Sequence, residues 1–403
     1  MSLYKDFRLN YKNKQLKNKL MKEGKILDFN TIDFSKKNVL VVDSIIPEYD
    51  RDSGSRRLHE LIKLMLKNGF RVFLVADKKE YKYKTDYVSY YNEMGVVTYE
   101  PCIDEDGNFV TRDVFIERIL QNIQFAWLHR ADMFYKYHDQ VSKHRHIKLI
   151  YDMVDFHYLR LDREWQLNKN PKVKKEADKY LNIETENCKN ADAIIAISDA
   201  DKQALKTFYS DDRKVITISN VHQYRGEAAS FYNREGLLFV GGFSHTPNQD
   251  AVLFLHEHIV PLLWERQPDL VVNIIGSYPT KEVLALNAKR FKVHGFVDDI
   301  SGYFRTSKVF VAPLRYGAGV KGKIGQSLEF GLPVVTTFIG AEGFDFGDNE
   351  NHCVDNTPQG MADKILKLYN EDSLWQRVSD ASEDILEPFS LKEIESRVLK
   401  LLS

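Results

Sequence analysis

A loop of glycines and lysines near residue 320 has the composition of an anion-binding site. Gly317, Gly319 and Gly322 lie within a stretch that also contains Lys321 and Lys323. Glycine permits backbone conformations that bring amide groups close to a ligand, and successive amides of this kind form concavities that hold anions. The two ammonium groups add positive charge at the same place. The sequence therefore predicts a phosphate-binding loop.

The segment 317–323 also satisfies the pattern G-x-x-x-x-G-K of the phosphate loop in nucleoside triphosphatases. In those proteins a serine or threonine follows the lysine and holds magnesium. Ile324 occupies that position here, and no matching acidic strand end comes later in the chain. We therefore expect phosphate to bind here without a dedicated metal ion.

A second candidate loop comes after the first predicted strand. It contains Gly54, which lets the backbone approach a ligand, followed by Arg56 and Arg57. Ser53 or Ser55 could cap the following helix, whose first amides would then face an anion. The loop has one glycine and no G-x-G-x-x-G pattern, so a capped surface helix with solvated arginines remains an alternative.

Histidines mark two further loops. Gly241 and Gly242 allow close approach beside His245, which could contact a phosphate or cap a neighbouring carbonyl group. Asp155 and His157 follow another strand, at the end where catalytic groups of parallel sheets are expected, although a single histidine there can be structural. The pair at 144 and 146 has no third ligand nearby, so no metal site is predicted.

The elements that must position these loops alternate between strand and helix along the chain. Short β-branched runs bounded by polar residues indicate buried strands. They lie at 38–44, 71–77, 95–99, 125–129, 148–155, 192–198 and 214–220, and then at 237–242, 270–276, 291–296, 308–314 and 332–337. The alternation predicts an α/β fold with two Rossmann-like, doubly wound domains facing across a cleft, where ligands bind at the carboxyl ends of the strands.

The predicted domain boundaries follow from this pattern. A polar stretch without usable periodicity, 221–236, interrupts the strand–helix alternation. The expected parts are a basic N-terminal arm at 1–36, a first Rossmann-like domain at 37–222, a linker at 223–236, a second Rossmann-like domain at 237–385, and a C-terminal helix at 386–403 that could pack back on the first domain.

Composition narrows the function classes. The 403 residues carry a formal net charge of −1, which argues against a general nucleic-acid binder. Three widely spaced cysteines form no CxxC, so neither a zinc knuckle nor a disulfide framework is indicated, and a reducing cytoplasm is the simplest location. No apolar run approaches the roughly 18 residues of a membrane span.

The first residues are basic and too polar for a signal peptide. Leu9, Leu16 and Leu20 lie among lysines there and could form a basic amphipathic helix. A solvated or frayed arm and an electrostatic contact with anionic lipid are both compatible with this pattern.

The chain resembles the retaining glycosyltransferases of the GT-B fold, specifically glycosyltransferase family 4. The resemblance covers about residues 38–385 and is most specific in LLFVGGFSHTPNQDAVLFL and HGFVDDISGYFRTSKVFVAPLRYGAGVKGKIGQSLEFGLPVVTTFIGAEGF. The segments DSIIPEYDRDSGSRR and YDMVDFHYLR are also similar to this family. The resemblance implies that a nucleotide-activated sugar binds mainly on the second domain and an acceptor mainly on the first.

The resemblance also implies residue roles. His157 lies where the family places a histidine near the transferred sugar, and we expect His157, Asp155 and Lys323 to act in catalysis. The expected donor-binding residues are Gly54, Gly241, Gly242, His245, Phe296, Val297, Gly317, Gly319, Lys321, Lys323 and Gln326. Among them, the backbone at Phe296 and Val297 matches the nucleobase contact, and position 326 matches the glutamate that binds the ribose.

The sequence departs from the family at charged positions. The two motif acids, spaced eight apart, fall on Ala318 and Gln326, and neither is acidic. The arginine and lysine that often bind the diphosphate fall near Gly242 or Phe243 and Asn248. We expect Lys321 and Lys323 to supply the missing positive charge.

The implied function is sugar transfer, with retention, from a nucleoside diphosphate sugar to a hydroxyl of a glycan or lipid-linked glycan. Bacterial surface polysaccharide synthesis is the expected setting. No cofactor, metal or nucleic acid is expected; the location is cytoplasmic, with peripheral membrane contact left open. The alternatives are a nucleotide-sugar epimerase and a catalytically silent subunit that binds sugar nucleotides. A dinucleotide oxidoreductase is disfavoured by the absent G-x-G-x-x-G.

Overall fold

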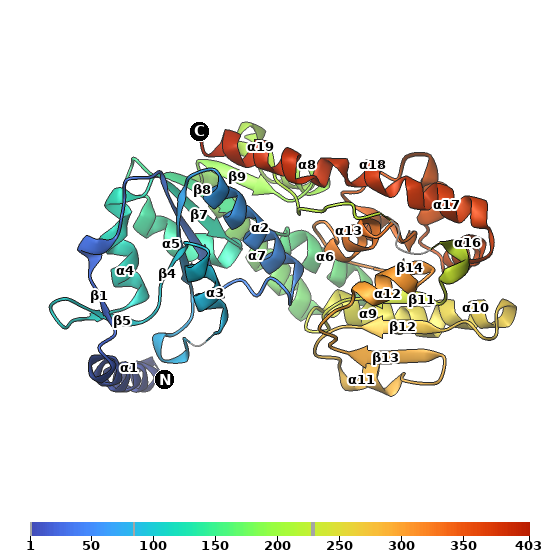
Figure 1. Ribbon diagram of the computed structural model, residues 1–403, viewed down its shortest axis with the longest axis horizontal. Coiled ribbons are helices and arrows are strands. Elements are labelled where there is room, and N and C mark those ends of the chain that lie inside the picture. Colours follow the sequence, from blue (N-terminus) through green and yellow to red (C-terminus); the bar gives the residue numbers. More distant parts are fainter. Residues whose placement is uncertain (1, 84, 227–229) are drawn as a thin grey trace.

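Two lobes, each built on one parallel sheet, make up the computed structural model, which describes residues 2–83, 85–226 and 230–403 (Figure 1). The sheet of the first lobe has the order β10-β9-β8-β7-β2-β3-β4, with every neighbouring pair parallel. Its strands are β2 (Asn38–Asp43), β3 (Arg71–Ala76), β4 (Val97–Thr98), β7 (Phe125–His129), β8 (Lys148–Asp152), β9 (Ala193–Ala196) and β10 (Val215–Thr217). All seven lie within the predicted ranges.

The sheet of the second lobe has the order β13-β12-β11-β14-β15, again parallel throughout. Its strands are β11 (Leu237–Val240), β12 (Val272–Ile275), β13 (Phe291–Gly295), β14 (Val309–Ala312) and β15 (Val334–Thr336). These too fall within the predicted ranges. Each sheet lies in its own hydrophobic core, and the predicted α/β class with two doubly wound sheets is confirmed.

Helices connect the strands of both sheets (Figure 1). In the first lobe they are α2 (Ser53–Lys67), α3 (Tyr87–Glu93), α4 (Arg112–Ile119), α5 (Ala131–Val141), α6 (His157–Asn168), α7 (Pro171–Asn190) and α8 (Asp199–Lys206). In the second they are α9 (Thr246–Phe254), α10 (Val260–Arg266), α11 (Lys281–Ala285), α12 (Ser301–Thr306), α13 (Gly322–Glu329), α14 (Phe338–Ala341), α15 (Glu350–Cys353), α16 (Pro358–Asn370), α17 (Asp372–Asp380) and α18 (Ser382–Leu386).

Helix α2 shows how the pattern becomes structure. Its apolar stripe, including Leu58 and Leu61, is fully buried against the sheet, and Gly69 takes the positive φ of 82° that ends the helix. The predicted cap is wrong: Asp52, not a serine, begins the helix, and its carboxylate accepts a hydrogen bond of 2.9 Å from the amide of Ser55. A carboxylate also interacts favourably with the helix dipole at this end.

The N-terminal segment is folded onto the first lobe, so the alternative of a frayed arm is wrong for its described part. Helix α1 (Ser2–Glu23) buries Leu20, and β1 (Ile26–Leu27) pairs with β5 (Cys102–Asp104), which pairs with β6 (Phe109–Val110). This small sheet was not predicted from the sequence. Among the helices that the structure describes, none combines the length and apolar character needed to cross a membrane.

The C-terminal helix α19 (Leu391–Leu401) belongs to the first lobe in space, although it follows the second lobe in sequence (Figure 1). Ile394 and Val398 are buried in the core of the first lobe. Glu395 pairs with Lys67 of α2 at 2.9 Å. The chain therefore crosses between the lobes twice, once near residue 222 and once before α19.

Candidate functional site

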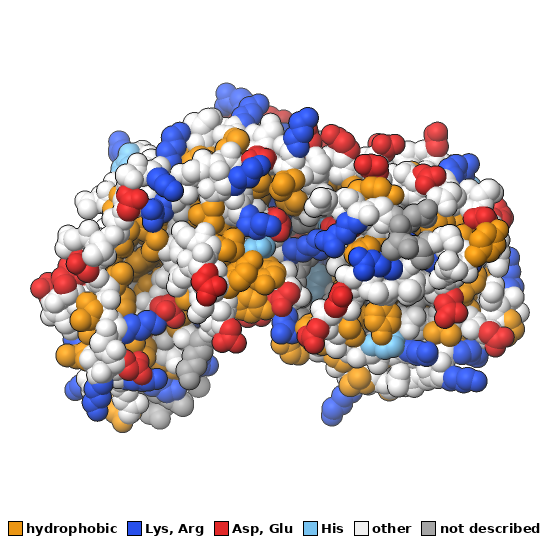
Figure 2. All heavy atoms as spheres, in the orientation of Figure 1, with side chains coloured by type: hydrophobic (Ala, Val, Ile, Leu, Met, Phe, Trp, Pro, Cys, Tyr) orange, Lys and Arg blue, Asp and Glu red, His pale blue; other side chains and the backbone are white. Residues whose placement is uncertain are grey.

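The loops after the strands of the two sheets meet where the lobes join. Figure 2 shows a notch between the lobes, with Lys and Arg side chains gathered at its margin. The loop between β14 and α13 approaches the loop between β8 and α6: a Cβ added to Gly319 would lie 3.4 Å from the Cβ of Asp155. The structure thus brings two of the predicted sites, one from each lobe, into contact.

The backbone of the first lobe is strained at this junction. Val154 has a φ of 65° and Arg130 a φ of 83°, both in loops that follow strands of the sheet. Positive φ is costly for a β-branched residue, and such strain concentrates at functional sites. The amide of Asp155 bonds to the carbonyl of Met153 at 2.8 Å, which closes the turn that presents the Asp155 carboxylate.

His157 is held between two carboxylates at the start of α6. Its Nδ1 lies 3.2 Å from Asp155 Oδ1 and 3.5 Å from Glu184 Oε1, and its ring stacks on Tyr180. Burial disfavours its charge, but the carboxylates of Asp155 and Glu184 outweigh burial and raise the pKa of His157. The side chain can therefore donate a proton or a hydrogen bond.

Lys323 carries a positive charge that has no carboxylate counter-ion among the described residues. Its ammonium is partly buried, donates to Asn248 Oδ1, and lies 5.0 Å from the ring centroid of Phe239. Asn248 in turn donates to the carbonyl of Gly242 at 2.7 Å. Burial and the charge of Lys321 lower the pKa of Lys323 to about 7. An uncompensated cation of this kind is suited to an anionic ligand.

The Lys321 side chain is bonded to its own loop, although both lysines were expected to face the ligand. Its ammonium is buried, donates to the carbonyls of Ala318 and Gly319, and lies 3.9 Å from Glu342 Oε2. Burial lowers its pKa despite this nearby carboxylate. In this conformation Lys321 stabilises its own loop through the hydrogen bonds to these two carbonyl groups.

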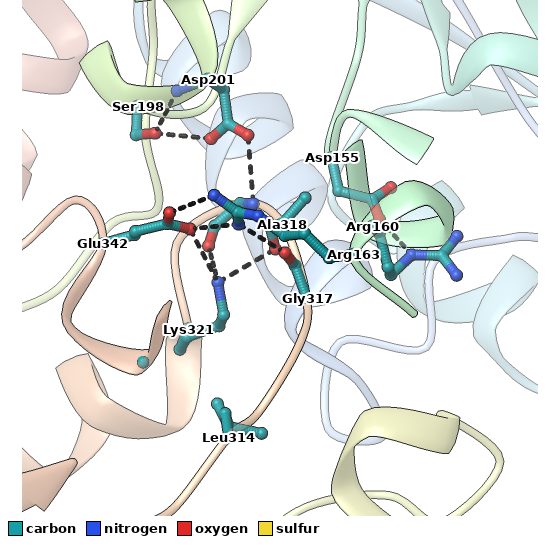
Figure 3. Close-up of polar contacts among 12 residues, drawn as sticks. Asp155, Arg160, Arg163, Ser198, Asp201, Leu314, Gly317, Ala318, Lys321 and Glu342 are labelled. Atoms are coloured by element: carbon teal, nitrogen blue, oxygen red, sulfur yellow. Dashed lines mark hydrogen bonds and ion pairs between the residues drawn. The ribbon is translucent and has the colours of Figure 1, made fainter. Parts of the chain in front are cut away.

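The glycine-rich loop is anchored by the first lobe. Gly317 and Gly319 have the expected positive φ, of 149° and 70°. Arg163 donates to the Gly317 carbonyl at 2.7 Å and forms a bidentate pair with Glu342 (Figure 3). The Gly319 amide donates to Asp201 Oδ1 at 3.2 Å, so this amide is not free for phosphate. The contacts of Arg163 with Gly317 and Glu342, and of Asp201 with Gly319, therefore join the two lobes.

Two glycines of α13 allow the lobes to approach closely. A Cβ on Gly322 would lie 2.1 Å from Ser53 Oγ at the start of α2. A Cβ on Gly325 would lie 2.2 Å from His222 Nε2 in the segment joining the lobes. These distances are far below van der Waals contact, so the glycines serve interlobe packing.

We predict that Gly325→Ala destabilises the chain by about 1–3 kcal/mol, because the rigid imidazole of His222 must move. The matched control is Gly302→Ala, on α12, where a Cβ would meet nothing within 4 Å. That change should be neutral or stabilising by up to about 1 kcal/mol. Urea unfolding measures both; equal stability of the two variants would contradict the packing described here.

A cavity of about 300 Å³ lies beside this contact, between the lobes. Its lining consists of Tyr49, Arg56, His59, Glu60, Arg225, Ser301, Gln326, Glu329 and Phe330. Gln326 therefore faces a space that both lobes enclose. The buried carboxylate of Glu329 lies 3.0 Å from Arg56 Nη2 and 2.7 Å from His222 Nδ1. These contacts hold this part of the cavity lining in place. Burial opposes the charge of Glu329, but these partners lower its pKa.

Phe296 and Val297 lie in the loop after β13. The Phe296 ring is 42% exposed, and the Arg51 guanidinium of the first lobe lies 4.3 Å from its centroid. Val297 is partly buried against the second core. Both residues lie a few positions before Ser301, which lines the same cavity as Gln326, the predicted ribose contact.

The remaining predicted residues lie at the start of α2 and α9. A Cβ on Gly54 would lie 3.1 Å from Arg130 Nη2, and one on Gly241 would lie 2.8 Å from the Asn248 side chain. A Cβ on Gly242 would meet Ser277 Oγ at 3.4 Å. These glycines therefore accommodate the polar side chains of the site.

His245 stands at the edge of the site, before α9, and makes no capping hydrogen bond with its side chain. Crowding by protein atoms, with the positive charges of Lys323 and Arg160, lowers the pKa of His245 to about 4. The imidazole is therefore neutral at pH 7. Its side chain makes no hydrogen bond to a neighbouring carbonyl group among the described residues, so the capping alternative is not supported.

A buried network below the site was missed from the sequence. Asp152, at the end of β8, accepts hydrogen bonds from Arg57 at 2.8 Å, Trp127 at 2.8 Å and His129 at 2.9 Å. Burial opposes ionisation of Asp152, but Arg57 and His129 lower its pKa strongly. The sequence feature that could have indicated this network is that the strands β2, β7 and β8 each end on a polar residue. Within the described residues, no group of three or more His, Cys, Asp or Glu side chains could hold a metal ion.

Comparisons with known proteins agree with this architecture. Residues 234–371 match the family described as Glycosyl transferases group 1. A curated relative, an uncharacterized 44.6 kDa protein in the cps region of Klebsiella pneumoniae, is 21% identical over 280 residues. The match spans 66% of this chain and 65% of that relative's length.

Solved structures extend the similarity to both lobes. HepE of Anabaena in complex with UDP-glucose is similar with a TM-score of 0.68 and 13% identity, over 91% of this chain and 99% of HepE. TarM of S. aureus is similar with a TM-score of 0.71 and 14% identity, over 92% of this chain and all of TarM. The fold is the GT-B architecture, and the match to the Glycosyl transferases group 1 model falls in the second lobe.

Proposed function

We propose that the chain is a glycosyltransferase that moves a sugar from a nucleoside diphosphate sugar to a hydroxyl group of a glycan. The observation that carries this proposal is Lys323. It is a cation without a carboxylate partner among the described residues, within the stretch that matches the Glycosyl transferases group 1 model, and it follows Gly322, which packs against Ser53 of the first lobe. A diphosphate supplies the negative charge that this position lacks.

The positions of Lys323 and Gln326 on α13 indicate where each part of the donor binds. Lys323 and Gln326 are three residues apart, so they lie on one face of the helix, separated by one turn. The nucleoside occupies the cavity at Gln326, and the ribose bonds to its amide. The diphosphate then reaches Lys323, and the sugar lies beside the loop at Gly317 and Gly319, opposite Asp155.

The proposed reaction retains the anomeric configuration. As the bond to the sugar lengthens, negative charge collects on the leaving diphosphate, and Lys323 stabilises that charge. Asp155 is engaged by Arg160 and His157, so it does not serve as a free nucleophile. The acceptor hydroxyl attacks from the face of the leaving group, within an ion pair, and passes its proton to an oxygen of the departing diphosphate. His157 donates a hydrogen bond that orients the sugar.

We further propose that the reaction needs no metal, because the Lys323 ammonium supplies the charge that a divalent cation supplies elsewhere. Addition of EDTA to the assay is expected to leave the rate unchanged. Loss of activity on chelation, with recovery on adding Mg²⁺ or Mn²⁺, would contradict this part of the proposal.

The setting that we propose is the synthesis of a bacterial surface polysaccharide in the cytoplasm, on a glycan or lipid-linked glycan acceptor. The relative in a cps region supports the first part. HepE was solved with UDP-glucose, which makes UDP-sugars the first donors to test. Contact with the inner face of the membrane is proposed through the lysines of α1, and sedimentation with anionic vesicles tests it.

A non-transferring role is the competing candidate, and Ala318 is the observation that favours it. No carboxylate from this position can hold the sugar, and Glu342 is already paired with Arg163. A subunit that binds sugar nucleotides without transferring the sugar, or an epimerase that changes it, could retain the donor site described here.

Incubation with UDP-, GDP- and dTDP-sugars and a panel of glycan acceptors distinguishes these functions. The proposal predicts a glycosylated product and a released nucleoside diphosphate for at least one donor. A donor that binds but stays intact in the presence of every acceptor would favour the silent subunit. Conversion of the bound sugar into its epimer would favour the epimerase.

A further inference from the structure

Arg160, on the first turns of α6, offers unpaired hydrogen-bond donors to the junction of the lobes. Its Nε donates to Asp155 Oδ2 at 2.9 Å. Its two terminal amino groups make no hydrogen bond to any residue in the described part of the chain, and Figure 3 shows them pointing away from Asp155. The side chain is 18% exposed, so most of it is buried by packing.

The position of Arg160 on α6 directs it towards the second lobe. Arg163, three residues later and on the same face of the helix, bonds to the Gly317 carbonyl. Asp155, which holds Arg160, lies against Gly319. The guanidinium is thus attached to the first lobe beside the place proposed for the transferred sugar.

The electrostatic surroundings of Arg160 overlap those of Lys323. The charges of both side chains act on His245 and disfavour its protonated form. Burial raises the pKa of Tyr316, the residue just before the glycine-rich loop, and the charge of Arg160 opposes that shift. Lys323 from the second lobe and Arg160 from the first are therefore both within electrostatic range of His245.

The second lobe alone offers few positively charged side chains for binding a diphosphate. Its loop after β11 has Gly242 and Phe243 where the family resemblance implies an arginine, and Lys321 is bonded to its own loop. A guanidinium presents parallel N–H groups that match the oxygens of a phosphate. An arginine contributed by the opposite lobe would restore the missing contact.

We propose that Arg160 binds the β-phosphate of the donor across the junction, opposite Lys323, and that Asp155 holds its guanidinium in place. This inference rests on the proposed function, because it requires a nucleoside diphosphate sugar in the site. It assigns a donor contact to the lobe otherwise expected to bind the acceptor. Donor binding would therefore depend on both lobes.

The test compares nucleoside diphosphate with monophosphate binding, using UDP and UMP, GDP and GMP, and dTDP and dTMP. Isothermal calorimetry measures Kd for the full chain and for Arg160→Gln. The variant is expected to lose affinity for the preferred diphosphate by about tenfold or more, since a charge-assisted hydrogen bond is removed. Its affinity for the matching monophosphate should stay within about twofold, which also shows that the site is folded.

Two further variants sharpen the result. Arg160→Lys keeps the charge without the planar fork, and should recover only part of the diphosphate affinity. Lys175→Gln removes one positive charge from an exposed position of α7 and should leave both affinities unchanged. An unchanged ratio of diphosphate to monophosphate affinity in Arg160→Gln would overturn the inference.

The same measurements separate this inference from the proposed function. If the unaltered chain transfers sugar but Arg160→Gln binds the diphosphate normally, only the role of Arg160 is wrong. If the diphosphate preference depends on Arg160 but no acceptor is glycosylated, the donor contact stands and the transferase function is wrong. If no nucleoside diphosphate binds the unaltered chain, both are overturned.

Discussion

Replacement of Lys323 by alanine is expected to lower kcat/KM for sugar transfer by about 100-fold or more. This is the usual effect of removing one preorganised donor from developing negative charge in a site shielded from water. Lys323 contacts Asn248 and the Phe239 ring but has no carboxylate partner among the described residues. Its removal therefore leaves no buried acid unpaired, and the fold should persist.

Steady-state kinetics with the preferred donor measures this effect, and unfolding by urea checks the fold. Lys289→Ala, at an exposed position after α11, removes a lysine of the same lobe outside the site and should retain full activity. A Lys323→Ala enzyme within a factor of two of the unaltered chain would show that the diphosphate does not bind at Lys323.

The lowered pKa of Lys323 adds a pH dependence to this prediction. In the free chain the ammonium loses its proton as pH rises through about 7. A diphosphate favours the protonated form, so binding above pH 7 requires uptake of a proton. Kd for the diphosphate should therefore rise with pH, approaching tenfold per unit, in the unaltered chain and stay nearly constant in Lys323→Ala.

Replacement of Arg57 by alanine is expected to cost about 3–5 kcal/mol of the free energy of unfolding, because it removes the arginine partner of the buried Asp152 carboxylate. The Arg57 and Asp152 side chains are fully buried and 2.8 Å apart. Arg57 also donates to the carbonyls of Ile218 and Ser219, which lie at the end of β10. Its removal therefore frees three acceptors below the site.

Urea unfolding of the two proteins at pH 7 measures the difference. Arg266→Ala is the matched control, since Arg266 pairs with Asp363 at 2.5 Å on the surface, with both side chains about half exposed. An exposed pair contributes about 0–1 kcal/mol. If Arg57→Ala and Arg266→Ala lose the same stability, the network at Asp152 does not support the first lobe.

The strands could be predicted because their signal is local. Buried parallel strands are short, β-branched and bounded by polar residues, and each of the twelve strands in the two large sheets fell within a predicted range. The strands β1, β5 and β6 are two or three residues long and were missed; β4 and β10 are equally short, but they were predicted as parts of the longer runs 95–99 and 214–220. The cap at Asp52 was missed because neighbouring serines offer the same chemistry.

The direction of side chains in the site could not be predicted, because it depends on distant partners. Lys321 and Lys323 look equivalent in sequence, yet one bonds to its own loop and the other to Asn248. Arg163 reaches Glu342 across 179 positions of the chain. Gly322 was expected to belong to the phosphate-binding loop, whereas it packs against Ser53 of the first lobe, and Gly325, for which nothing was predicted, packs against His222.

A crystal structure of the chain with its preferred nucleoside diphosphate sugar would show directly whether the diphosphate binds at Lys323. A phosphate oxygen is expected within about 3 Å of the Lys323 ammonium, the range of a charge-assisted hydrogen bond. The nucleoside should then fill the cavity at Gln326. A diphosphate bound at another place, for example on Arg56 and Arg225 with Lys323 still bonded to Asn248, would contradict binding at Lys323.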